Sequence, residues 1–135
     1  RTRMVILYYH ANRDDLLVCG TSNRTEYLIG YCTKFGDNAA DLQPILHLYK
    51  TEVFVFAREL GIPERIITKT PSAGLSAGQT DETDIGLTYP EIDTALKVLE
   101  KNGWNSANPI EEKVLSLVKK NAHKRTDPPS LPWIP

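Results

Sequence analysis

Cysteine and long apolar runs are scarce in this 135-residue sequence. The two cysteines, Cys19 and Cys32, are too few for a disulfide framework or a four-ligand zinc site. No stretch approaches the ~20 consecutive apolar residues that a membrane-spanning helix needs, and the longest, at residues 4–9 and 53–57, have the length of core segments. We therefore expect a protein of a reducing compartment, the cytoplasm, with no membrane partner.

An excess of positive charge is also missing. Sixteen Lys and Arg residues oppose 17 Asp and Glu residues, so the formal net charge is −1. Proteins that bind nucleic acid mainly through its phosphates usually show a clear basic excess. We therefore expect no nucleic-acid partner. The sequence also has no Gly-x-Ser-x-Gly, Walker lysine loop, Cys-x-x-Cys or His-Glu-x-x-His, which excludes the common hydrolase, P-loop, redox and zinc-protease classes.

Helical patterns alternate with short apolar runs along the chain. Periodicity and capping signals predict helices over residues 2–12, 23–32, 50–60, 89–103 and 108–124. The apolar run Leu16-Leu17-Val18-Cys19, which ends at Gly20, predicts a buried strand of a parallel sheet. The length suits one domain, and the alternation indicates an α/β fold with a partial, doubly wound parallel sheet, since only two or three strands can be found.

Two segments have no periodic pattern. Residues 68–88 contain three glycines and many Ser, Thr and Asp residues, which predicts a functional or mobile loop. Residues 126–135 contain four prolines and should form an extended tail.

The segment from Leu16 to Glu26 has the pattern of a nucleotide site. Open α/β sheets place nucleotides where a strand ends and feeds a helix N-terminus. The Thr21 hydroxyl could hydrogen-bond a nucleotide, and Glu26 in the first helical turn could bind a magnesium ion. Asn23 and Glu26 also fit an ordinary capping box, so the spacing alone leaves both interpretations open.

Several charged residues are further candidates. Lys34 and Asp41 belong to one polar loop, which either grips a polar substrate or is simply solvated. Lys50 opens a helix, where its charge opposes the positive end of the helix dipole unless an anion binds nearby. The run at residues 123–125 ends a helix, where its cations complement the dipole. Cys19 and Cys32 are expected in the core.

A series of short motifs follows one another in fixed order along the chain. They are Gly20-Thr21-Ser22-Asn23-Arg24-Thr25-Glu26, Thr33-Lys34-Phe35-Gly36-Asp37, Asp41-Leu42-Gln43-Pro44, Lys50, Pro71-Ser72-Ala73-Gly74-Leu75, Gly78-Gln79-Thr80-Asp81-Glu82, Gly86-Leu87-Thr88-Tyr89 to Asp93, and His123-Lys124-Arg125. In this register they resemble the C-terminal half of the ammonia-dependent NAD synthetases. The resemblance covers nearly all of residues 1–125.

The resemblance implies a Rossmann-like fold of the adenine nucleotide α-hydrolase type and a homodimer. It also implies a reaction in which deamido-NAD is adenylated by ATP and then amidated by ammonia, releasing AMP and pyrophosphate without a covalent nucleophile on the enzyme. By position, it implies that Thr21, Lys50 and Ser72 contact ATP and that Glu26 binds Mg²⁺. The positions that would bind deamido-NAD are Arg1, Lys34, Asp41, His123 and Lys124.

One part of the family pattern is not in this sequence. The Ser-Gly-Gly-x-Asp-Ser loop that holds the pyrophosphate of ATP, and the first sheet strands, would precede Arg1. We therefore expect residues 1–135 to be the C-terminal portion of one synthetase domain and to be inactive alone. Two alternatives stay open: a non-catalytic dimerisation or nucleotide-binding fragment, and another ATP-pyrophosphatase-type ligase such as GMP synthetase or a tRNA-thiolating enzyme. The latter would not be expected to share residues 79–82 or His123-Lys124.

Overall fold

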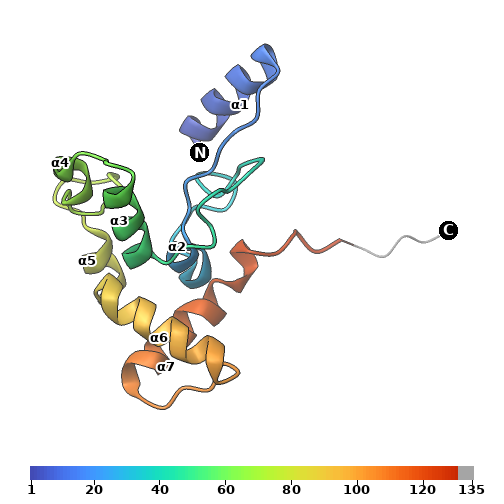
Figure 1. Ribbon diagram of the computed structural model, residues 1–135. Coiled ribbons are helices and arrows are strands. Elements are labelled where there is room, and N and C mark those ends of the chain that lie inside the picture. The colour runs from blue at the N-terminus through green and yellow to red at the C-terminus, as the bar shows by residue number, and fades with distance from the viewer. Residues whose placement is uncertain (131–135) are drawn as a thin grey trace.

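The computed structural model describes residues 1–130, and the regular elements within that range are helices joined by loops. The helices are α1 (Thr2–Asp14), α2 (Arg24–Ile29), α3 (Lys50–Glu59), α4 (Glu64–Ile67), α5 (Asp81–Ile85), α6 (Tyr89–Lys101) and α7 (Pro109–Lys120), followed by the 3₁₀ turn η1 (Ala122–Lys124). Figure 1 shows α2, α3, α6 and α7 gathered in one body, with α1 standing away from it.

The core lies where α6 and α7 pack against each other and against α2. On α6, Ile92, Leu96 and Leu99 are spaced by four and three residues, so they share one face, and none of them is exposed. Val114 of α7 and Ile29 of α2 belong to the same hydrophobic core. Burying side chains of this size stabilises the fold by roughly 1.5–3 kcal/mol each. This core fixes α2, the helix that directly follows the Gly-Thr-Ser-Asn segment.

Side-chain caps begin three helices where the sequence predicts them. The Asn23 carboxamide accepts the Glu26 N–H at 3.0 Å, and the Glu26 carboxylate accepts the Asn23 N–H at 3.2 Å. Thr88 caps α6 in the same reciprocal way, and Asn108 caps α7. The capping box at Asn23 and Glu26 is therefore confirmed, and the helices expected from residues 89 and 108 begin beside side-chain caps.

The predicted parallel sheet is not confirmed within residues 1–130. The segment Leu16–Cys19 forms one isolated parallel bridge, from Cys19 to Leu42, rather than a strand. The Gly20 N–H donates to the Leu42 carbonyl at 2.8 Å, but Pro44 follows closely and has no N–H to extend the ladder. Leu16 and Leu17 are consequently 62% and 71% exposed.

Several predicted boundaries and burials are wrong in detail. Gly30 ends α2 in a left-handed conformation with φ 69°, so Cys32 lies beyond the helix and is half-buried, and Cys19 is exposed. The expected loop at 68–88 contains α5. Helix α7 ends at Lys120, so His123 and Lys124 belong to η1. Of the expected tail, residues 126–130 carry no helix or strand, and residues 131–135 lie outside the described part.

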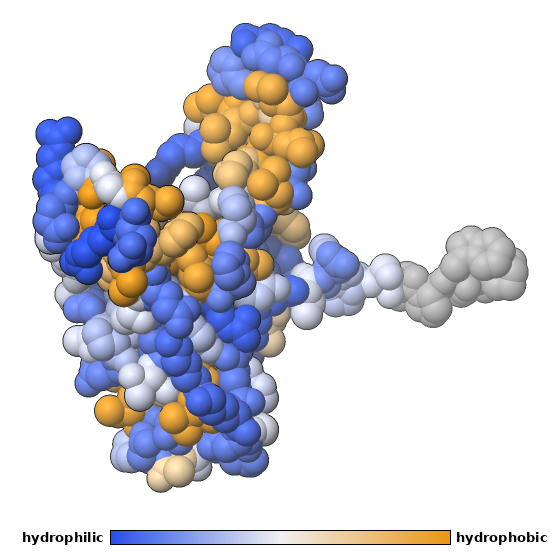
Figure 2. Space-filling view, in the orientation of Figure 1, coloured by the Kyte–Doolittle hydropathy of each residue, from blue (hydrophilic) through white to orange (hydrophobic). Residues whose placement is uncertain are grey.

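Helix α1 exposes most of its apolar side chains. Val5, Ile6, Leu7 and Tyr9 are each more than half exposed, and Ala11 is the buried residue of this helix. Figure 2 shows the resulting apolar surface around α1. No helix in residues 1–130 has both the length and the apolar character that crossing a membrane demands.

Candidate nucleotide site

The N-termini of α2 and α3 bring Glu26 and Lys50 together. The Lys50 ammonium donates to Glu26 Oε1 at 2.9 Å, and both side chains are less than 20% exposed. The ammonium also lies 5.0 Å from the ring centre of Tyr89 and 5.9 Å from that of Phe54. The carboxylate therefore offsets the unfavourable position of a lysine at the start of a helix. The two side chains share one place in the fold, as their predicted common role requires.

A pocket of about 320 Å³ adjoins this pair. It lies between α3, residues 67–71 and the start of α6, and its lining includes Phe54 and Tyr89, the two rings under the Lys50 ammonium. Pro71, next to Ser72 in the chain, also lines it. Ser72 is itself exposed, and its hydroxyl accepts the Gly74 N–H at 3.1 Å.

Thr21 lies in the exposed part of the loop that leads into α2. Its two successors, Ser22 and Asn23, are buried. Thr21 thus lies five residues before Glu26 on a segment that the Asn23 cap holds in place.

Glu26 is one carboxylate rather than part of a metal cage. Among residues 1–130, no group of three or more His, Cys, Asp or Glu side chains is arranged to hold a metal ion. Both Glu26 oxygens already accept hydrogen bonds, one from Lys50 and one from the Asn23 N–H. Proteins commonly bind Mg²⁺ through one or two carboxylates plus substrate phosphates. Glu26 fits that kind of site, in which the nucleotide supplies most of the ligands.

A buried junction behind this pair escaped the sequence analysis. Thr25 is fully buried, and its hydroxyl donates to the Asp93 carboxylate and accepts the Lys50 N–H at 2.9 Å. Asp93, 2% exposed, also accepts the Thr51 N–H at 2.8 Å. A signal was present, because Asp93 directly follows Ile92 on the apolar face of α6, where an aspartate needs partners.

The acidic residues of α5 bind tyrosines. The Tyr89 hydroxyl donates to Asp81 at 2.7 Å, and the Tyr31 hydroxyl donates to Asp84 at 2.8 Å. Burial, followed by these hydrogen bonds, raises the pKa of both tyrosines. Hydrogen bonds from Gln79 and Tyr31 lower the pKa of Asp84. The motif at residues 78–82 therefore orders α5 beside the Lys50 ammonium through Tyr89.

Two of the lysines predicted to bind the dinucleotide hold main-chain carbonyls. Lys34 donates to the carbonyls of His123 and Thr126, both at 2.6 Å. Lys124 donates to those of Gly30 and Cys32, at 2.7 and 2.9 Å. The structure therefore brings Lys34, His123 and Lys124 to one place near the end of α2.

The end of α2 also receives Asn121 and Arg125. The Arg125 guanidinium donates to the Leu28 carbonyl at 2.6 Å, and the Asn121 carboxamide donates to the Ile29 carbonyl at 2.9 Å. Together with Lys124, these side chains satisfy the carbonyls that a helix leaves unpaired at its C-terminus, and the two cations complement its dipole.

Asp41 and Arg1 are located with α1 rather than at the end of α2. The Asp41 carboxylate accepts the Val18 N–H at 2.7 Å and the Tyr8 hydroxyl at 3.3 Å, so it ties α1 and the segment after it to the 33–41 loop. Arg1 is exposed at the start of α1. These positions do not bring Asp41 or Arg1 into contact with Lys34 or Lys124.

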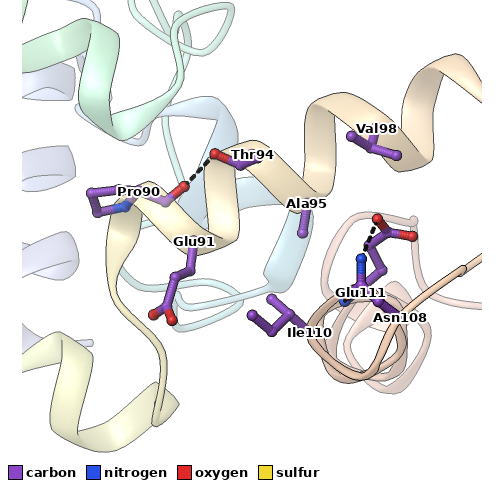
Figure 3. A pocket seen from close by; sticks show the side chains of 8 residues that line it. All are labelled: Pro90, Glu91, Thr94, Ala95, Val98, Asn108, Ile110 and Glu111. Atoms are coloured by element: carbon purple, nitrogen blue, oxygen red, sulfur yellow. Dashed lines mark hydrogen bonds between the residues drawn. The ribbon is translucent and has the colours of Figure 1, made fainter.

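A second pocket, of about 340 Å³, lies between α6 and α7 (Figure 3). Ala95, Val98 and Ile110 line it, and Ile110 is 40% exposed. None of the predicted site residues lines this pocket.

Solved synthetases contain a half that is similar to this chain. The structure described as NMN synthetase from Francisella tularensis is 39% identical, with a TM-score of 0.85 over 98% of this chain and 53% of its own. The ammonia-dependent NAD synthetase from Campylobacter jejuni, in complex with nitrate, is 32% identical, with a TM-score of 0.75 over 96% of this chain and 51% of its own. The helices and connections described above are thus similar to those of one half of these two solved proteins.

The NAD synthase family model matches residues 1–128, and the chain belongs to that family. The ammonia-dependent NAD synthetase of Methanoregula boonei is 64% identical over all 135 residues, and that of Thermococcus sibiricus is 52% identical over 95% of this chain. In both cases the match covers 54% of the relative. The chain therefore spans about half the length of these relatives.

Proposed function

We propose that residues 1–135 form part of an ammonia-dependent NAD synthetase that converts deamido-NAD to NAD with ATP. The observation that carries this proposal is the Lys50–Glu26 pair, formed where two helix N-termini meet in a chain of this family. A cation and two helix N-termini favour the phosphates of a nucleotide. Thr21 and Ser72 would contact the same ATP from the two loops beside the pair.

The proposed reaction has two steps. A carboxylate oxygen of deamido-NAD bonds to the α-phosphorus of ATP while the bond to pyrophosphate breaks. The ammonia lone pair then attacks the carbonyl carbon of this mixed anhydride, ammonia gives up a proton, and AMP leaves. Mg²⁺ would neutralise charge on the phosphates. Lys50 would hold phosphate oxygens, Glu26 would be the one protein carboxylate on the metal, and alignment would supply most of the rate.

The proposed dinucleotide site uses the opposite end of α2. Lys34, His123 and Lys124 already meet there, and Asp41 lies on the same loop as Lys34. Lysine ammonium groups suit phosphates, and a carboxylate suits ribose hydroxyls. Lys34 would exchange its two carbonyl partners for the substrate, and Arg1 would approach from α1.

The parts of the relatives that this chain does not match would complete the site. We propose that they supply the loop that holds the pyrophosphate and that the active form is a homodimer. Exposed apolar side chains on α1 and on α3, where Val55 is 59% exposed, support contacts with further protein.

The test compares the encoded full-length protein with isolated residues 1–135. Each is assayed with ATP, Mg²⁺, deamido-NAD and saturating ammonia, and NAD, AMP and pyrophosphate are measured. We expect NAD, AMP and pyrophosphate in equal amounts from the full-length protein and no turnover from residues 1–135. No NAD from the full-length protein would contradict the proposed function, and equal rates would show that residues 1–135 suffice.

A second substrate deserves the same assay because a similar structure is described as an NMN synthetase. The mononucleotide analogue of deamido-NAD carries the same carboxylate without the adenylate half. We expect a higher kcat/KM with deamido-NAD. A preference for the mononucleotide would reassign the substrate and leave the ATP chemistry unchanged.

A further inference from the structure

One buried carboxylate joins the starts of two helices. Asp93 of α6 accepts the Thr51 N–H of α3 at 2.8 Å with one oxygen and the Thr25 hydroxyl of α2 with the other. The same Thr25 oxygen accepts the Lys50 N–H at 2.9 Å. Thr25 is fully buried and Asp93 is 2% exposed, so water does not substitute for these partners.

The junction is adjacent to both side chains of the candidate nucleotide site. Thr25 precedes Glu26 in the first turn of α2, and its hydroxyl oxygen accepts a hydrogen bond from the main-chain N–H of Lys50, the first residue of α3. The positions of these two backbones set the 2.9 Å separation of the Glu26 carboxylate and the Lys50 ammonium. The Asp93 charge also lies at the positive end of the α3 dipole, which favours docking of that helix end.

We infer that Asp93, acting through Thr25, is a positioning residue for ATP binding by Glu26 and Lys50. The inference rests on the proposed function and adds residues to which that proposal gives no role. Both side chains are buried, so their inferred role is to hold the two helix starts in register rather than to contact the nucleotide. Loss of the Thr25 hydroxyl leaves the Lys50 N–H unpaired and frees the start of α3 to shift, and misplacements of about 1 Å cost up to 10²-fold in rate.

The test uses Thr25→Val, Thr25→Ser and Asp93→Asn in the full-length protein. Thr25→Val keeps the shape and removes the hydroxyl, whereas Thr25→Ser keeps the hydroxyl. We expect Thr25→Val and Asp93→Asn to raise the KM for ATP roughly tenfold or more and Thr25→Ser to stay within about threefold. The KM for deamido-NAD should change much less. Calorimetric binding of a non-hydrolysable ATP analogue with Mg²⁺ gives a second measurement that does not need turnover.

Glu111→Gln is the matched control. Glu111 is also a buried carboxylate at a helix start, where it accepts the Ala107 N–H at 2.7 Å, but it serves α7. We expect it to lower the melting temperature without changing the KM for ATP. Should Thr25→Val not fold, Asp93→Asn beside Glu111→Gln makes the same comparison.

The outcomes separate the inference from the proposed function. An unaltered protein that makes NAD, with Thr25→Val and Asp93→Asn variants that keep its KM for ATP and its analogue affinity, overturns the inference alone. An unaltered protein that makes no NAD overturns the proposed function, and analogue binding by Thr25→Val beside Thr25→Ser still decides the inference.

Discussion

Lys50 and Glu26 form an ion pair 2.9 Å long across the first turns of α3 and α2. Each side chain is partly withdrawn from water, and the carboxylate offsets a lysine placed at the positive end of a helix dipole. The pair is therefore expected to couple energetically even without a nucleotide.

A double-mutant cycle of Glu26→Gln and Lys50→Met measures that coupling. We expect an interaction free energy of about 0.5–3 kcal/mol in urea unfolding, because both partners are partly buried. The control cycle, Arg13→Met with Asp14→Asn, breaks an exposed pair and should give about 0–1 kcal/mol. A larger coupling for the exposed pair would refute the structural role given to Lys50 and Glu26.

Substitution of Lys34 tests the dinucleotide site. Lys34→Ala removes a cation that would bind a phosphate, and charged hydrogen bonds contribute about 1.5–3 kcal/mol, so the KM for deamido-NAD should rise roughly 10- to 100-fold. Asp41→Ala should change it in the same direction. The matched control is Lys113→Ala, which also removes a lysine that donates to a main-chain carbonyl, in this case that of Gly86 at 2.7 Å. Equal KM values for Lys34→Ala and the unaltered protein would count against this site.

Lys124 should also contribute to folding stability. Lys124→Met removes two hydrogen bonds to the end of α2 and is expected to cost about 1–3 kcal/mol of unfolding free energy. Amide exchange should accelerate in residues 24–32. Lys119→Met, at an exposed position in the last turn of α7, should stay within about 0.5 kcal/mol. Indistinguishable exchange in the two variants would contradict the capping role.

Alkaline pH should destabilise the fold through Tyr89. Its pKa is raised by burial and by the bond to Asp81, so the folded state favours the protonated phenol. This contribution is complete below the unfolded tyrosine pKa of about 10 and is lost as pH rises above it. Tyr89→Phe should flatten the decline of unfolding free energy above that pH, and Tyr9→Phe, at an exposed position, should not. Parallel curves for all three proteins would disprove this assignment.

The helix starts were predictable because their signals are local. Asn23 with Glu26, and Thr88 with Glu91, pair within three residues, and the spacing of Ile92 and Leu96 gives the buried face directly. The meeting of Glu26 with Lys50 was expected only from the resemblance, since 24 residues separate them.

Contacts between distant segments left no trace in the sequence. The carbonyls that accept from Lys34 and Lys124 belong to segments about 90 residues away. The local sequence does not distinguish a cation that binds a distant carbonyl from one that only complements a helix dipole. The strand expected at Leu16–Cys19 depended on partners outside its own pattern, and within residues 1–130 this segment forms a single β-bridge, from Cys19 to Leu42. Asp93 was detectable only as a carboxylate on an apolar face.

The short length of α2 has a consequence for the order of folding. Six residues are far fewer than the ~12–15 that an isolated helix needs, so α2 depends on what reaches its C-terminus. Those contacts span 92 to 98 residues of chain. During synthesis, the helix that carries Glu26 is therefore completed only after Asn121 to Arg125 have emerged. A chain that stopped before residue 121 would retain the whole Gly-Thr-Ser-Asn motif but would lose the helix that positions the Glu26 carboxylate.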